Sequence, residues 1–344
     1  NLIIIEKKNE VYITVDCESD IQREISEFFT FYVPGYKFMP AFRNRMWDGK
    51  IRLFSQKTKE IYFGLFPYIK AFAEERQYHI VCGKDVEIDN KVDKDVVAKF
   101  SNSLGQKFEA RDYQIDAIYH SLKYNRALLL SPTASGKSFI IYSLIRYYSH
   151  LIKDETNNRI LLIVPTTSLV EQMYSDFQSY GWNVKKNCHR LYSGYSNQTD
   201  KKVLISTWQS LYKLPKTYFE QFGCVFGDEA HLFKSKSLTE IMTKLEDCKY
   251  RIGLTGTLDG AQTHKLVLEG LFGAVNKVTS TRKLMDKQQL SNLVVRCLIL
   301  KHTVENSKMV ASGKYQDEID YLVSSKSRQN FIRNLALKLK GNTL

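Results

Sequence analysis

Short apolar runs alternate with segments of helical periodicity through the middle of the chain. The runs predict five strands, at residues 127–131, 160–165, 203–207, 224–228 and 251–255. Between them, apolar positions recur at helical spacing. A continuous apolar run is typical of a strand covered on both faces, and strand–helix alternation implies a parallel sheet with right-handed crossovers. The pattern therefore predicts an α/β domain with helices on both faces of a parallel sheet.

The flanking segments have other patterns. Residues 2–5 and 11–15 predict a hairpin, and helical spacing follows near residues 19–29 and 68–76, as in a small α+β domain. A stretch rich in charged residues comes next and indicates a linker. The patterns divide the chain into a small α+β domain at 1–85, a linker at 86–106, the α/β domain at 107–290 and a C-terminal segment at 291–344.

The first strand of the α/β domain leads into a loop that contains Gly136 and precedes a helical pattern. A strand, such a loop and a helix in this order form a phosphate-binding loop, where backbone N–H groups and the positive end of the helix face the phosphates. We expect Lys137 to reach the β- and γ-phosphates and Ser138 to ligate Mg²⁺. Ser131 stands where such loops usually have their first glycine. The predicted ATP-binding residues of the loop are Thr133, Ala134, Ser135, Gly136, Lys137 and Ser138.

The strand at 224–228 ends in an Asp-Glu-Ala-His tetrad at 228–231. Because ligands bind at the carboxyl ends of parallel strands, this acidic turn and the phosphate loop point to one crevice. We expect Asp228 to hold Mg²⁺ and Glu229 to orient and deprotonate a water. Lys137, Asp228 and Glu229 are thus the candidate catalytic residues for ATP hydrolysis. The alternatives are a chance Gly-Lys-Ser at an ordinary helix start and a solvated acidic turn.

Further motifs in the same order resemble those of superfamily-2 helicases of the DEAH-box type. Gln114, with Arg111, lies upstream of the loop where this family reads adenine, and an amide offers a donor and an acceptor. Two segments resemble those that grip a nucleic-acid backbone, and another resembles the motif that couples hydrolysis to the strand. The resemblance implies a RecA-like P-loop fold for 107–290. It implies strand contacts at Pro165, Thr166, Thr167, Gln172, Ser206, Thr207, Trp208 and Gln209, and coupling roles for His231, Thr255 and Thr257.

The N-terminal region narrows this resemblance. Residues 36–54 and 61–65 are similar to the N-terminal domain of phage UvsW-type recombination helicases. The similarity implies an ATP-dependent DNA helicase or translocase that acts on junctions, forks and R-loops in recombination, replication and repair, with residues 1–85 recognising the substrate. It also implies single-stranded and branched duplex DNA and RNA–DNA hybrids as partners, a monomer, no membrane association, and the cytoplasm of a bacterial host.

The charge distribution fits a nucleic-acid partner. The 344 residues carry a net charge of +13, and basic residues dominate the segment 36–59. Basic groups neutralise phosphates and release counterions, which makes Arg43, Arg45, Lys50 and Arg52 predicted DNA contacts. The six cysteines include no C-x-x-C pair, so neither a zinc site nor a disulfide framework is indicated. The interleaved aromatic residues are predicted to form the core of the small domain: Phe38, Phe42, Trp47 and Phe54.

Motors of this family use two RecA-like lobes, and the second supplies arginine fingers worth about 10³–10⁵ in rate. No later helicase motif follows Thr257, and the chain runs from Asn1 to Leu344. We therefore expect a fragment, truncated early in the second lobe at 291–344, that binds ATP·Mg²⁺ weakly and hydrolyses it slowly or not at all. Two other functions remain open: an RNA helicase or duplex translocase on the same core, and a non-enzymatic nucleic-acid-binding module with a vestigial ATP site.

Overall fold

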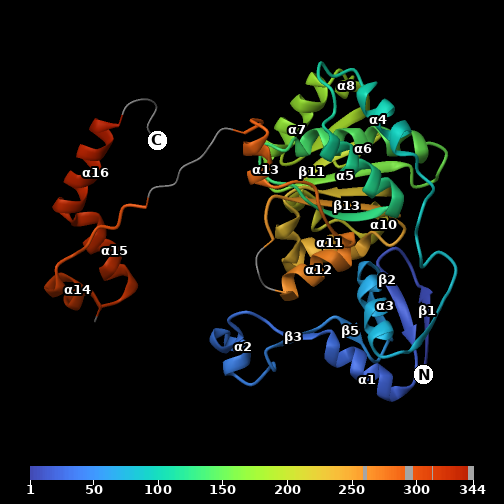
Figure 1. The fold of residues 1–344 in the computed structure, drawn as a ribbon, viewed down its shortest axis with the longest axis horizontal. Coiled ribbons are helices and arrows are strands. Elements are labelled where there is room, and N and C mark those ends of the chain that lie inside the picture. Colours follow the sequence, from blue (N-terminus) through green and yellow to red (C-terminus); the bar gives the residue numbers. More distant parts are fainter. Residues whose placement is uncertain (259–261, 291–296, 312, 340–344) are drawn as a thin grey trace. The chain divides into compact units, whose positions relative to one another are not determined.

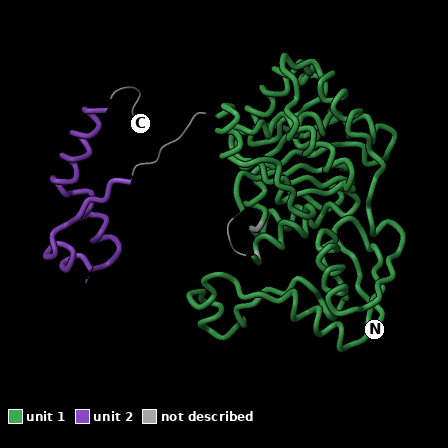
Figure 2. The backbone as a smooth tube through the Cα atoms, viewed as in Figure 1, with its two compact units in different colours: residues 1–290 green, residues 291–344 purple. Residues whose placement is uncertain are grey.

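The computed structural model describes residues 1–258, 262–290, 297–311 and 313–339 (Figure 1). These residues belong to two compact units, residues 1–290 and residues 291–344 (Figure 2). The first unit contains a small N-terminal sheet and a larger parallel sheet, and it holds every residue that the motifs single out.

A seven-stranded parallel sheet forms the centre of the first unit. Its strands follow the order β10 (Cys188–Leu191), β11 (Val203–Thr207), β9 (Arg159–Val164), β12 (Phe222–Gly227), β13 (Tyr250–Thr255), β8 (Arg126–Leu130) and β14 (Val275–Lys277). Five strands lie within a residue or two of the predicted apolar runs. The two edge strands, β10 and β14, were not predicted. The α/β fold class with a RecA-like parallel sheet is confirmed.

Successive residues of a central strand face opposite helical layers. In β9, Ile160 and Leu162 join one core, whereas Leu161 and Ile163 join another. The first core lies against α5 (Asp112–Tyr124), α6 (Lys137–Leu151) and α7 (Thr167–Ser179), and the second against η3 (Ala230–Lys234), α11 (Lys236–Lys244) and α12 (Gln262–Phe272). Coverage on both faces explains why these strands read as unbroken apolar runs. Shorter helices complete the unit: α8 (Val184–Asn187), α9 (Trp208–Leu211), α10 (Lys216–Phe219) and α13 (Thr281–Asp286).

The N-terminal residues form a mixed five-stranded sheet. Its strands follow the order β5 (Phe54–Ser55), β6 (Glu60–Tyr62), β2 (Tyr12–Asp16), β1 (Leu2–Lys7) and β7 (His79–Cys82). The predicted hairpin is the antiparallel pair β1–β2, and β7 pairs with β1 in parallel. Helices α1 (Ser19–Phe28) and α3 (Phe66–Glu75) bury their apolar residues in the core of this sheet, together with the short helix η2 (Phe63–Leu65).

Residues 30–52, called the arm below, project from this small domain, with α2 (Pro40–Arg43) far from α1 and α3 (Figure 1). The strands β3 (Thr30–Tyr32) and β4 (Lys50–Arg52) pair antiparallel, and η1 (Tyr36–Phe38) precedes α2. The arm has a small aromatic core of its own. The Tyr36 ring stacks on Tyr32 with centroids 4.6 Å apart and meets the Phe42 ring edge-on at 4.7 Å.

The predicted aromatic core of the small domain is correct only in part. Phe54 is 2% exposed within that core, as predicted. Phe42 and Trp47 are half-buried within the arm instead, and the Trp47 indole N–H donates to the Lys50 carbonyl at 2.8 Å. Phe38 is 85% exposed, so its assignment to the core was wrong.

The N-terminal sheet and the parallel sheet share one apolar core. A single buried cluster includes Ile13 of β2, Phe63 of η2 and Leu268 of α12. Gly64 lies so near α12 that a Cβ there would be 1.9 Å from the Glu269 carbonyl oxygen, so only glycine fits. The two sheets are therefore packed directly on each other.

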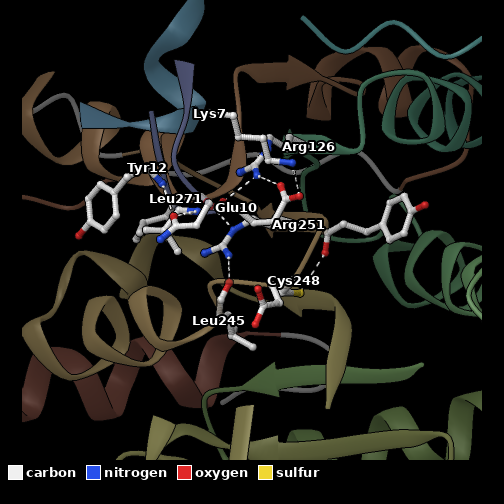
Figure 3. A network of polar contacts seen from close by, with 12 residues as sticks. Lys7, Glu10, Tyr12, Arg126, Leu245, Cys248, Arg251 and Leu271 are labelled. Carbon is white, nitrogen blue, oxygen red and sulfur yellow. Dashed lines mark hydrogen bonds and ion pairs between the residues drawn. The ribbon is translucent and has the colours of Figure 1, made fainter. Parts of the chain in front are cut away.

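A buried ion pair lies in the same joint (Figure 3). Glu10 occupies the turn between β1 and β2, and Arg126 is the first residue of β8. Arg126 Nη2 donates to both Oε2 and the carbonyl of Glu10, each at 2.7 Å, and Lys7 also pairs with this carboxylate. Arg126 is only 7% exposed and Glu10 only 8%. A carboxylate of the N-terminal sheet thus neutralises a cation of the parallel sheet.

Arg251 of β13 is the strand partner of Arg126 and is fully buried. It donates to three backbone carbonyls, those of Leu271, Leu245 and Met242, at 2.8–2.9 Å (Figure 3). Burial lowers the pKa of Arg251 to about 10, and the neighbouring Arg126 acts in the same direction. Two buried cations therefore lie side by side at the amino ends of β8 and β13.

The remaining segments are helical. In the predicted linker, Asp93 caps α4 (Lys94–Asn102), and Val97 joins the core of α5 and α6. The second unit contains α14 (Val304–Ala311), α15 (Tyr315–Ser324) and α16 (Lys326–Lys338), with no buried residue among those described. Its assignment to a second lobe and the division of the chain into four segments stay predictions. Among the described helices, none combines the length and the apolar character that a membrane span requires.

Candidate nucleotide-binding site

The phosphate loop connects the carboxyl end of β8 to the first turn of α6. The Ser131 N–H donates to the Thr255 carbonyl at 2.8 Å, which ties the start of the loop to β13. Ala134, with φ 65°, and Gly136, with φ 81°, are left-handed. A Cβ at position 136 would lie 2.3 Å from Gln114 Nε2, so the loop requires glycine there.

Ser131 replaces the usual first glycine without backbone strain, since its φ is not positive. Its Oγ lies 2.6 Å from Ser135 Oγ, and Ser135 donates its own proton to the Pro132 carbonyl at 2.6 Å. Ser131 is therefore the donor to Ser135. Both serines are fully buried, and their hydroxyls brace the loop from inside.

Gln114 connects α5 to the loop. Its Nε2 donates to the Ser135 carbonyl and its Oε1 accepts from the Arg111 N–H, both at 2.9 Å. The Arg111 guanidinium donates to the Tyr113 hydroxyl at 2.7 Å. Both ends of the Gln114 amide thus have partners within the chain, and the side chain is 4% exposed.

The acidic turn after β12 meets the loop. Lys137 Nζ lies 2.7 Å from Glu229 Oε1. Asp228 is 3% exposed, and its N–H donates to the Ile163 carbonyl of β9 at 2.9 Å. Burial raises the pKa of the Asp228 carboxyl, Lys137 opposes the rise and Glu229 adds to it. The structure brings the three predicted catalytic residues into one electrostatic group.

The donors of this group fit a hard divalent ion. Among the described residues, Asp228 Oδ1 is a buried oxygen without a hydrogen-bond partner. Such an oxygen is costly unless a cation or a donor satisfies it. Asp228 and the Ser138 hydroxyl would hold the ion. No cluster of three or more His, Cys, Asp or Glu that suits a metal occurs in the described ranges, so phosphate and water oxygens would complete its shell.

His231 connects the acidic turn to the Thr-Gly-Thr motif after β13. Its Nδ1 lies 3.0 Å from Thr255 Oγ1 and 3.4 Å from Glu229 Oε2. Because Thr255 Oγ1 donates its proton to the Thr257 carbonyl at 2.8 Å, the proton between His231 and Thr255 belongs to Nδ1. Glu229, His231, Thr255 and Thr257 form one chain of polar contacts.

The first predicted strand-contact segment follows β9 and lies on the surface. Thr166, Thr167 and Gln172 are exposed, and Pro165 is half-buried. Thr166 Oγ1 accepts from the Leu169 N–H at 3.3 Å and caps α7. The segment therefore presents hydroxyl and amide groups beside the amino end of a helix.

The second segment, after β11, is less accessible. Gln209 is exposed and Trp208 is half-buried. Ser206 is fully buried and donates to the Leu191 carbonyl at 3.1 Å, and Thr207 is 4% exposed. The side chains of Ser206 and Thr207 therefore pack inside the fold, and they do not present their hydroxyls at the surface.

The basic residues of the arm differ in their surroundings. Arg43 and Arg45 are exposed. Lys50 Nζ lies 5.0 Å from the centroid of the Tyr32 ring. Arg52 pairs with Asp48, Nη2 to Oδ2, at 2.5 Å. Arg43 and Arg45 are therefore the most available cations of the predicted set.

Comparisons with known proteins place the chain in a family. A model of the N-terminal domain of the DNA helicase UvsW matches residues 3–83, and a model of the type III restriction enzyme res subunit matches residues 107–260. The crystal structure of the UvsW helicase from bacteriophage T4 is 32% identical, with a TM-score of 0.73 over 80% of this chain and all of the crystallised chain. This chain belongs to the UvsW family of superfamily-2 helicases.

Other relatives agree with this placement. The "ATP-dependent DNA helicase uvsW" of phage T4 is 33% identical over 337 residues, which are 95% of this chain and 66% of the T4 protein. A second crystal structure of T4 UvsW covers 98% of this chain and 67% of its own, with a TM-score of 0.74 and 30% identity. The "DNA 3'-5' translocase XPB2" of Sulfurisphaera tokodaii is 25% identical over 69% of this chain and 48% of its own. The chain therefore spans about two thirds of the length of the T4 protein and about half of the length of the XPB2 protein.

Sequence reasoning missed two features of this family member. Tyr180, at the end of α7, has its hydroxyl 2.9 Å from Ser138 Oγ, and nothing in its sequence neighbourhood signals that contact. Glu10 and Arg126 join the two sheets. Here a signal existed: Arg126 and Arg251 are charged residues at the starts of apolar strands, where burial requires a partner.

Proposed function

We propose that this chain is the DNA-recognition and ATP-binding part of an ATP-dependent DNA helicase or translocase that acts on junctions, forks and R-loops. The contact between Lys137 and Glu229 carries the proposal, together with Asp228 Oδ1, which has no hydrogen-bond partner among the residues that the structure describes. This arrangement occurs at the carboxyl ends of β8 and β12 in a chain 33% identical to a protein named an ATP-dependent DNA helicase. The resemblance of the N-terminal region extends this proposal to roles in phage recombination, replication and repair.

The nucleotide site works by exchange of partners. An incoming β,γ-phosphate attracts Lys137 away from Glu229, since a phosphate carries more negative charge than one carboxylate. Glu229 is then free to accept a proton from water and to orient that water toward the γ-phosphorus. Asp228 and Ser138 would hold Mg²⁺, which would supply positive charge to neutralise the phosphates. Residues 133–136 supply backbone N–H groups to the same phosphates.

Two neighbouring groups read and transmit the state of the nucleotide. Gln114, with Arg111, borders the loop, and adenine would replace one of the partners that the Gln114 amide has within the chain. His231 contacts Glu229 and Thr255, so a shift of Glu229 reaches Thr257 through hydrogen bonds. We propose that this path couples the nucleotide to the segments after β9 and β11, which bind the strand.

The DNA contacts lie on that surface and on the arm. Thr166, Thr167 and Gln172 face the phosphate backbone, with Pro165, Trp208 and Gln209 beside them. Arg43, Arg45, Lys50 and Arg52 of the arm bind the phosphates of branched duplexes or of RNA–DNA hybrids. We further propose a monomer that acts in the cytoplasm of a bacterial host.

ATP hydrolysis by the full-length protein tests the proposal. Single-stranded DNA, blunt duplex, forked DNA and RNA are compared at equal nucleotide concentration, with Lys137→Ala as the inactive reference. Forked DNA should stimulate most. A greater response to RNA would support the RNA helicase, and equal responses to blunt and forked duplex would support the duplex translocase. DNA binding without any hydrolysis would support the module with a vestigial site.

A further inference from the structure

The hydroxyl of Ser138 has a partner outside the phosphate loop. Tyr180 follows the last residue of α7, and its hydroxyl lies 2.9 Å from Ser138 Oγ. Helix α7 also carries Thr167 and Gln172 of the predicted strand-contact segment. One helix therefore presents strand-facing residues along its length and a nucleotide-site contact at its end.

The Tyr180 ring is held in place by other rings. It packs against Phe139, Tyr142 and Phe108 with centroid distances of 5.6, 5.1 and 5.8 Å. Its N–H donates to the Asp176 carbonyl at 3.0 Å, which fixes the backbone as well. Because the ring has little freedom, the position of its hydroxyl is determined before any nucleotide binds.

A serine that ligates a cation uses a lone pair of Oγ for the metal and must direct its proton elsewhere. Two acceptors are near Ser138. One is the Tyr180 oxygen, and the other is the carboxylate of Asp176, which also interacts with the Ser138 hydroxyl. Tyr180 is the partner with a short contact in a fixed orientation.

We propose that Tyr180 is a positioning residue for the metal-binding hydroxyl of Ser138. By accepting the Ser138 proton, Tyr180 turns the lone pairs of Oγ toward the ion that accompanies the nucleotide. The inference rests on the proposed nucleotide site. It adds that the end of α7 sets the affinity of that site for the divalent ion.

Tyr180→Phe tests this role, since it removes one oxygen and keeps the ring. Binding of a fluorescent ADP analogue to the full-length protein is titrated with Mg²⁺ and repeated in EDTA. The variant should need about three- to tenfold more Mg²⁺ for half-maximal enhancement of binding, as expected for one lost hydrogen bond, with unchanged affinity in EDTA. Tyr142→Phe is the matched control, because Tyr142 packs in the same cluster but its hydroxyl does not contact Ser138: it accepts from Arg146 and lies within hydrogen-bond distance of the backbone carbonyls of Leu104 and Tyr180. It should leave the Mg²⁺ requirement unchanged.

A double-mutant cycle separates positioning from packing. In a Ser138→Ala background, Tyr180→Phe should have no further effect on the Mg²⁺ requirement. An equal effect in both backgrounds would overturn the proposal, as would a normal requirement in Tyr180→Phe together with a raised one in Asp176→Asn. If the unaltered protein binds the analogue without any response to Mg²⁺, the proposed nucleotide function itself fails.

Discussion

Lys137 Nζ contacts Glu229 Oε1 at 2.7 Å, so the cation expected to bind phosphate is paired with the carboxylate expected to activate water. The side chains are 17% and 30% exposed, which leaves the pair open to an incoming ligand. Lys137 and Glu229 are therefore each occupied by the other in this structure. Binding of a nucleotide must break this pair before hydrolysis can start.

Glu229→Gln should retain nucleotide binding and lose turnover. The amide cannot accept the proton of the attacking water, and loss of a general base reduces rates by about 10²–10⁴. The variant should also bind ATP at least as tightly as the unaltered protein, because Lys137 no longer has to break an ion pair with a carboxylate before it contacts the phosphates. Single-turnover hydrolysis and equilibrium binding of a fluorescent ATP analogue measure the two effects. Normal turnover would remove Glu229 from its assigned role.

Lys137→Ala should abolish nucleotide binding at concentrations that saturate the unaltered protein. It removes the phosphate-binding cation and also leaves Glu229 as an uncompensated negative charge facing the phosphates. The double variant Lys137→Ala/Glu229→Gln should recover part of the binding, because that repulsion is gone. A double variant no better than Lys137→Ala would show that the two side chains do not compete.

Ala134→Gly should stabilise the protein by about 1 kcal/mol, since a non-glycine residue in the left-handed region costs about that much. Ala134 has φ 65°, where glycine is free of strain. The opposite change, Gly136→Ala, should destabilise, because its Cβ would collide with Gln114 Nε2. Thermal unfolding of both variants checks the signs. A lower melting temperature for Ala134→Gly would contradict the strain argument.

Glu10→Gln should reduce the free energy of unfolding by about 3 kcal/mol at neutral pH, because it leaves Arg126 buried without its counter-charge. Burial alone would raise the pKa of Glu10, but Arg126 and Lys7 outweigh it, and the net pKa lies below the ordinary 4.5. A depressed carboxyl pKa stabilises the fold above the unfolded pKa, and this contribution disappears as pH falls through the folded pKa. The gap between the variant and the unaltered protein should therefore close as the pH falls through the lowered folded pKa of Glu10.

Chemical denaturation across pH 3–8 measures this gap. Glu87→Gln is the control, since Glu87 forms an exposed pair with Lys70 and should alter stability little at any pH. A pH-independent gap for Glu10→Gln would mean that lost packing, and not lost charge, causes its effect.

Arg43→Ala should weaken DNA binding equally for all sequences and lower the slope of log K against log salt by about one. The residue is exposed on α2, so its removal should not affect folding. Lys153→Ala, an exposed cation beyond the end of α6, should leave the slope unchanged. An unchanged slope for Arg43→Ala would place the DNA elsewhere.

The features that could be predicted were those that depend on residues close together in the sequence. The runs around Leu128 and Leu161 identify strands covered on both faces, and the loop before α6 together with Asp228 identifies the nucleotide site. Strand β10 was missed because His189 and Arg190 interrupt its apolar pattern at an edge of the sheet.

Contacts between residues far apart in the chain could not be predicted from the sequence. Glu10 and Arg126 meet across 116 positions, and Ser138 and Tyr180 across 42. Neither spacing corresponds to a helical or strand period. Phe38 shows the reverse problem: its apolar character suggested a core position, although the arm uses Tyr36 and Phe42 for its own packing.

The common core beneath Gly64 and the Glu10–Arg126 pair attach the small domain directly to the parallel sheet. The small domain, from which the arm projects, is therefore anchored to the body that carries the phosphate loop. A DNA branch bound by the arm would therefore be linked, through the small domain, to the same sheet that carries the phosphate loop.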